Sequence, residues 1–142
     1  MTRRSAASYT RCVGHFNVRA TLTGPTGLSE SIDLLLDTGA TFIVLPRAVA
    51  MRLDLQPRRV CRVEVAGGRQ EEWPMADVRI VIAGIGAPTP CLIADAGVPL
   101  LGAVALESLL LVVDPVGKRL IPTNALAMST SRDAVRSLAV VY

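Results

Sequence analysis

The stretch that decides the fold is Leu34-Leu35-Leu36-Asp37-Thr38-Gly39-Ala40-Thr41. A carboxylate ends an apolar run, and a hydroxyl and a glycine follow it. Glycine permits a sharp turn and a close backbone approach. An isolated charge beside so much apolar surface is costly, so we expect N–H groups of the turn and Thr38 to hydrogen-bond Asp37. Two interpretations stay open: an Asx-type turn that only ends a strand, or an acid that does chemistry.

The residues before this stretch predict a hairpin. Apolar and polar residues alternate from Phe16 to Leu22, which is the period of a half-buried strand. Gly24-Pro25-Thr26-Gly27 is a turn cluster. Ser29 to Leu36 is then the returning strand, and its apolar end should lie deep in the domain.

The residues after it read as short strands with frequent turn signals. We expect strands at 42–45, 60–65, 70–75, 78–82, 91–94, 110–113 and 118–121, and helices at 47–53 and 103–109. Gly67-Gly68 is a hairpin turn signal, and Pro74 indicates an edge or a bulge. Gly84, Gly86, Pro88 and Pro90 should separate two strands. The pattern predicts an all-β fold, a small closed barrel with one or two short helices.

Length and composition fit one globular domain. The chain has 142 residues, of which 51% are hydrophobic and 4% aromatic. The net charge of +3 is explained by surface arginines, including Arg58, Arg59, Arg62 and Arg69. A nucleic-acid adaptor would need aromatic platforms or a recognition motif, and neither is present.

Cysteine usage and hydropathy indicate a cytoplasmic location. Cys12, Cys61 and Cys91 are widely spaced and odd in number, so we expect reduced thiols and no disulfide framework. No secretory signal is recognisable near Met1. The longest apolar run, residues 98–113, is too short to span a bilayer comfortably. We therefore expect no metal, no cofactor, no nucleic acid and no membrane as partners.

Several elements in order resemble the retropepsin-like (clan AA) aspartic proteases, the clan of retroviral proteases and their small bacterial relatives. Residues 36–41 look like the catalytic loop, and residues 63–73 look like the flap hairpin. Leu100-Leu101-Gly102 is similar to the apolar-apolar-Gly element before the family's helix, and residues 111–114 to the strand after it. Residues 100–115 look most like the bacterial members. The resemblance implies an N-terminal arm (1–12), a protease domain (13–122) and a tail (123–142) that is either a dimer-interface strand or disordered.

The resemblance implies an aspartic endopeptidase that acts as a homodimer on a peptide or protein substrate. Asp37 would be the catalytic residue and would pair with Asp37 of a second chain, because this sequence has one Asp-Thr-Gly. Supporting residues of the loop would be Thr38, Gly39 and Ala40, and the flap tip would be Ala66, Gly67 and Gly68. The alternative is a catalytically weak or inactive dimerisation or peptide-binding module of the same fold.

The sequence departs from the retroviral pattern at three positions. Thr41 and Phe42 stand where carboxylates are usual, and Ala103 stands where an arginine is frequent. Interface contacts through those groups are therefore not expected.

Other residues with chemical potential have simpler interpretations. His15 is the only histidine, and we expect an exposed or hydrogen-bonded strand residue without triad or zinc partners. Trp73 either packs on the base of the flap or covers the core. Glu71 and Glu72 are expected to be solvated.

Overall fold

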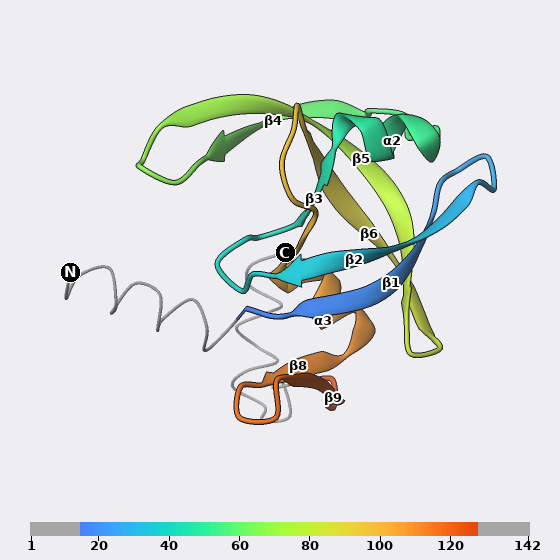
Figure 1. Cartoon of the computed structure of the whole chain (residues 1–142), viewed down its shortest axis with the longest axis vertical. Coiled ribbons are helices and arrows are strands. Elements are labelled where there is room, and N and C mark those ends of the chain that lie inside the picture. Colours follow the sequence, from blue (N-terminus) through green and yellow to red (C-terminus); the bar gives the residue numbers. More distant parts are fainter. Residues whose placement is uncertain (1–14, 128–142) are drawn as a thin grey trace, which may run out of the picture.

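The computed structural model describes residues 15–127, which form nine strands and two short helices (Figure 1). The strands are β1 (Asn17–Thr23), β2 (Ser29–Leu36), β3 (Ile43–Pro46), β4 (Arg59–Glu64), β5 (Gln70–Ile82), β6 (Ile85–Ala94), β7 (Leu100–Leu101), β8 (Leu111–Asp114) and β9 (Arg119–Pro122). The helices are α2 (Arg47–Arg52) and α3 (Ala103–Leu109). Neither helix has the length and apolar character needed to cross a membrane.

Seven strands form one sheet that closes on itself. Their order is β1-β2-β7-β3-β6-β5-β4, and residues 21–23 of β1 also pair with residues 79–81 of β5. The result is a ring of six strands, with β4 outside it as the partner of β5. This confirms the predicted all-β fold with a closed sheet and short helices.

The core lies inside the ring and follows the alternation of the strands. Val18, Ala20 and Leu22 of β1 are buried, as the period of two predicts. Leu34 and Leu36, at the end of β2, are fully buried, which confirms the deep position expected for this segment. Burying each such leucine is worth about 1.5–3 kcal/mol.

The short strand β7 lies between β2 and β3. Leu35 and Leu36 pair with Leu100 and Leu101 in parallel, and Val44 pairs with Leu100 in the antiparallel sense. The two strands that flank Asp37 are therefore joined through a segment from much later in the chain.

The predicted break between residues 84 and 90 is wrong, because β6 begins at Ile85 and runs through Pro88 and Pro90. β6 pairs with β5 from Ile85 onward, whereas β3 pairs with β6 only from Cys91. Both prolines therefore lie where β6 has one neighbour, and a missing N–H is tolerated at a free edge. Pro74 pairs with β4 just before β6 joins β5 at Met75, so its predicted edge position is confirmed.

After α3 the chain forms a separate two-stranded sheet, in which β8 pairs with β9. The predicted arm (1–12) and residues 128–142 of the predicted tail lie outside the described residues.

Candidate active site

Asp37 lies immediately after β2, in the loop of residues 37–42 that we call the Asp37 loop. Its N–H donates to the carbonyl of Leu101 at 3.0 Å, and its carbonyl accepts the N–H of Ala40 at 3.0 Å. Carboxylate Oδ1 accepts the N–H of Gly39 at 3.0 Å. The side chain remains 33% exposed. The carboxylate is thus held by its own turn and is still open to a ligand.

The N-terminus of α3 supports the Asp37 loop. The N–H groups of Ala103 and Val104 donate to the carbonyls of Ala40 and Thr41, each at 2.9 Å. The first N–H groups of a helix have no partner within it, so these two bonds satisfy both elements.

Gly102 allows the helix to approach this closely. A Cβ atom at this position would lie 2.4 Å from the carbonyl oxygen of Phe42 and 2.8 Å from that of Ala40. These are backbone atoms that cannot rotate away, so the close approach explains why glycine follows Leu100-Leu101.

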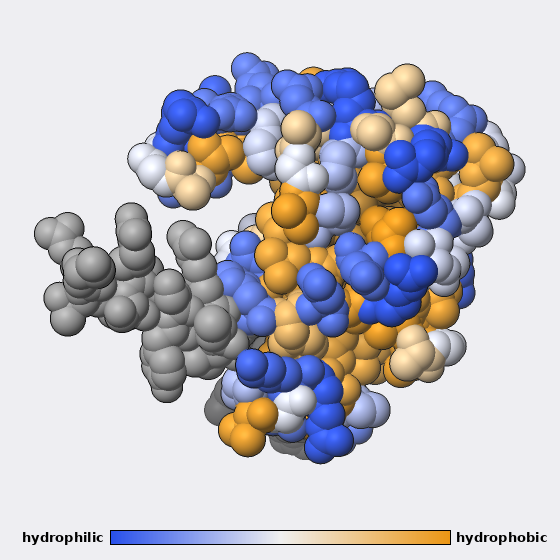
Figure 2. All heavy atoms as spheres, viewed as in Figure 1, coloured by the Kyte–Doolittle hydropathy of each residue, from blue (hydrophilic) through white to orange (hydrophobic). Residues whose placement is uncertain are grey.

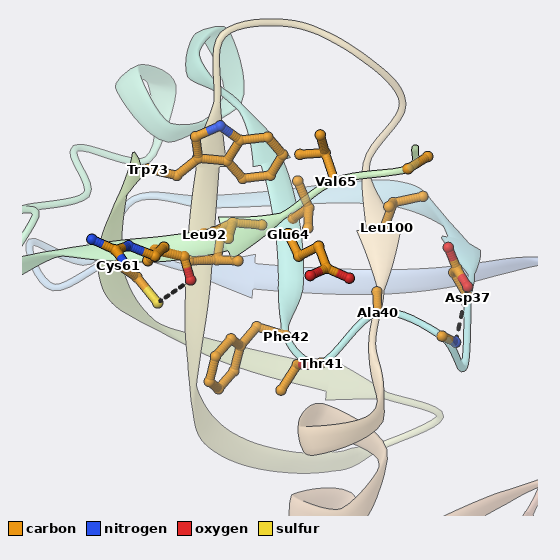
Figure 3. Close-up of a pocket in the computed structure, with 15 residues that line it drawn as sticks. Asp37, Ala40, Thr41, Phe42, Cys61, Glu64, Val65, Trp73, Leu92 and Leu100 are labelled. Carbon is orange, nitrogen blue, oxygen red and sulfur yellow. Dashed lines mark hydrogen bonds between the residues drawn. The ribbon is translucent and has the colours of Figure 1, made fainter. Parts of the chain in front are cut away.

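A groove of about 660 Å³ runs between the Asp37 loop and the β4–β5 hairpin (Figures 2 and 3). One wall is the Asp37 loop, and the other is β4 with the start of its turn, residues 61–66. Val44, Leu92, Leu100 and Trp73 complete the lining. Most of these side chains are apolar, so the groove suits apolar groups of a ligand. In Figure 3 Trp73 and Phe42 lie on opposite sides of the groove.

The structure brings some of the predicted site residues into this groove and leaves others out. Asp37, Gly39, Ala40 and Ala66 line it. Thr38 is exposed and does not line it. The bond expected from an N–H of the turn to Asp37 is confirmed and comes from Gly39, whereas no bond from the Thr38 side chain to Asp37 is present among residues 15–127.

Gly67 and Gly68 lie in the turn of the β4–β5 hairpin but do not line the groove. Their φ angles are +95° and +82°, a conformation that glycine adopts without strain. The N–H of Gly68 donates to the carbonyl of Val65 at 3.0 Å. The predicted hairpin turn is therefore confirmed.

His15 lies beside Asp37, which the sequence reasoning missed. Its Nε2 is 3.5 Å from Asp37 Oδ1. The hairpin register explains the proximity: Asn17 pairs with Leu35, and continuing that register by two residues sets His15 opposite Asp37. The sequence predicted the hairpin but not its register, because the register depends on the conformation of the turn.

Trp73 is fixed against the groove by a neighbour on its own strand. Its Nε1–H donates to Glu71 Oε1 at 2.9 Å, and the guanidinium of Arg69 donates to Glu71 Oε2 at 2.8 Å. The bond from Trp73, and then that from Arg69, lower the pKa of the Glu71 carboxyl from its usual value. Glu72 is exposed as expected, whereas Glu71 is part of this hydrogen-bonded set.

The two described cysteines differ in surroundings. Cys91 is fully buried, and burial raises the pKa of its thiol to about 12, so it is a small core residue. Cys61 is partly buried and lines the groove rather than the core. Within residues 15–127, no group of three or more His, Cys, Asp or Glu side chains is placed to hold a metal ion.

A closed β-sheet, an apolar groove under a glycine-tipped hairpin and a carboxylate at the groove's wall together define the class of retropepsin-like aspartic proteases. The family described as "gag-polyprotein putative aspartyl protease" matches residues 29–108, more than half of the chain. The chain belongs to this family.

A solved structure agrees with that assignment. EIAV protease complexed with the inhibitor HBY-793 is similar with a TM-score of 0.53 and 25% identity, over 75% of this chain and 92% of that one. The solution structure of Simian Foamy Virus (mac) protease has a TM-score of 0.48 and 16% identity, over 64% of this chain and 91% of that one. No curated protein matches the sequence.

Proposed function

We propose that this chain is an aspartic endopeptidase in which Asp37 is the catalytic residue. The observation that carries the proposal is the position of its carboxylate, held through Oδ1 by Gly39 and open to an apolar groove. Membership of an aspartyl protease family supports the same chemistry.

The reaction needs a second carboxylate, which a second copy of the chain supplies. Two carboxylates at short range cannot both ionise, so they share one proton and titrate as a pair. The charged one acts as general base on a water molecule, and the protonated one donates to the scissile carbonyl oxygen. A two-fold axis beside Asp37 brings the two copies together. By the family resemblance, Thr38 bonds across this axis, and its exposure leaves it free to do so.

The surface around β8 and β9 is our proposed contact between the two copies. Leu110, Val112 and Ile121 are large apolar side chains that are 42%, 41% and 36% exposed. A two-stranded sheet alone is marginally stable in water. Pairing with the same surface of a second copy would cover these side chains and extend the sheet.

The substrate is an extended peptide that enters the groove as an added strand. Main-chain hydrogen bonds hold such a peptide, and alternate side chains enter pockets. The apolar lining favours hydrophobic side chains next to the cut bond. Residues 66–68 form the flap tip, whose closure excludes water.

We also propose that residues 13–122 are the protease domain and that the protein is cytoplasmic. The free thiols of Cys61 and Cys91 support a reducing location.

The decisive experiment compares the parent with Asp37→Asn on a diverse peptide mixture from acid to neutral pH. Asp77→Asn is the matched control, because Asp77 is an exposed carboxylate on β5 that pairs with Arg58 at 3.0 Å. We expect cleavage by the parent and the control, and a rate about 10²–10⁴-fold lower for Asp37→Asn. The parent's rate should rise with pH as the dyad loses the first of its two protons, and should fall again as it loses the second, shared one.

Light scattering on the same samples tests the assembly. A dimer that cleaves nothing would mean that the chain is a binding module, and a strict monomer that cleaves would remove the symmetric mechanism.

A further inference from the structure

The histidine beside Asp37 is not used by the mechanism above. His15 and Asp37 are 30% and 33% exposed, and Nε2 lies 3.5 Å from Oδ1. That distance exceeds a typical hydrogen bond but lets a protonated imidazole attract the carboxylate. The approach is not accidental, because the N–H of Leu36 donates to the carbonyl of Phe16 at 2.8 Å and continues the β1–β2 ladder to this point.

The two oxygens of Asp37 have different surroundings. Oδ1 accepts the N–H of Gly39 and faces His15. Within residues 15–127, no hydrogen bond reaches Oδ2. One oxygen is thus held by the chain itself, and the other is left for the water and for the shared proton.

We propose that His15 is a positioning residue for Asp37: its protonated imidazole attracts Oδ1 and holds the carboxylate in place, which leaves Oδ2 to do the chemistry. The proposal rests on the proposed function of Asp37. In the dimer two carboxylates repel one another, and a positive charge next to each offsets that repulsion.

No other described charge competes for His15. On β1 and β2 the nearest charged side chains in sequence are Arg19 and Asp33, which pair with each other at 3.3 Å. The Asp37 loop, β3 and β7 carry no ionisable side chain besides Asp37, and α3 carries only Glu107, which is exposed. Asp37 is the one carboxylate within ion-pair distance of His15 among residues 15–127.

The first test needs no cleavage. His15 is the only histidine of the chain, so a single imidazole signal can be followed by NMR as pH changes. At acid pH we expect the imidazole signal of Asp37→Asn to differ in position from that of the parent, because the neutral amide no longer attracts the ring. The control Asp77→Asn should match the parent. Identical imidazole signals for all three proteins would overturn the proposal.

The second test uses activity. His15→Gln removes the charge and keeps a polar side chain, whereas His15→Arg keeps a permanent positive charge. We expect the acid limb of the pH–rate profile of His15→Gln to move to higher pH, with a rate ~3–10-fold below that of the parent on that limb and a smaller loss at the optimum. His15→Arg should return the acid limb toward that of the parent.

The outcomes separate this inference from the proposed function. A purely structural role would lower the rate of His15→Gln equally at every pH, and that result would contradict the inference. If the parent cleaves peptides but the Asp37→Asn substitution leaves the imidazole signal unchanged, the role of His15 is wrong and the peptidase assignment stands. If the signal changes but the parent cleaves nothing, the peptidase assignment is wrong and the contact between His15 and Asp37 stands.

Discussion

Replacing Gly102 with alanine tests how tightly α3 is docked under the Asp37 loop. The new Cβ would lie 2.4 Å from the carbonyl oxygen of Phe42 and 2.7 Å from its carbonyl carbon, where no real contact of this kind occurs. Either the helix or the loop must move. Overpacking of this kind costs about 1–3 kcal/mol. Movement also weakens the bonds from Ala103 and Val104 to the loop, worth about 1 kcal/mol each.

We therefore expect Gly102→Ala to lower the free energy of unfolding by about 2–4 kcal/mol. For a urea slope of about 2 kcal/mol per molar, the midpoint should fall by about 1–2 M. Peptide cleavage should fall even where the variant is folded, because Phe42 and Ala40 line the groove.

Urea unfolding followed by circular dichroism, at one fixed protein concentration, measures this change. The matched control is Gly84→Ala, because Gly84 has a φ of +82° and open space around its Cβ position. Its cost should be about 1 kcal/mol, from the backbone conformation alone. If the two variants unfolded at the same midpoint, the steric argument for Gly102 would be wrong.

Two further predictions concern the hairpin and the assembly. Trp73 and Arg69 lower the pKa of Glu71 in the folded state, so the stability that this carboxylate contributes is present at neutral pH and is lost as pH falls below the usual glutamate range. In thermal unfolding, Glu71→Gln should therefore lose less stability than the parent between pH 6 and 3. Val112→Lys puts a charge on the proposed contact surface and should weaken the dimer at least tenfold in sedimentation, whereas an unchanged dimer would place the interface elsewhere.

The elements that follow from local pattern were predictable. Alternation predicted β1 and β2, and Gly67-Gly68 predicted the β4–β5 turn. The helix expected at 103–109 has those bounds in the structure, and the helix expected at 47–53 ends one residue earlier. These features depend on residues near one another in the chain, so a single sequence carries their signal.

The features that depend on distant pairing were not predictable. Periodicity says that a segment is a strand but not which strand it joins, so neither the β1–β5 closure nor the insertion of β7 could be derived. β6 was missed in part because proline is a strong local signal for a break. Proline is tolerated in a strand at a free edge of the sheet, and only the order of the strands shows that β6 has such an edge at Pro88 and Pro90.

The same limit applies to the candidate site. Asp37 and Gly102 belong to motifs and were recognisable, whereas the approach of His15 depends on the exact register of β1 and β2. The turn pairs Thr23 with Ser29, and the sequence Gly24-Pro25-Thr26-Gly27 alone is compatible with other registers. A slip of one residue would turn His15 to the other face of the hairpin.

The insertion of β7 also imposes an order on folding. The strands on either side of Asp37 reach each other only through Leu100 and Leu101, and the helix that supports the loop comes later still. Contacts between such distant residues form late, because a long segment must first be closed. A polypeptide still growing on the ribosome therefore contains Asp37 before it contains the residues of β7 and α3 that position the Asp37 loop.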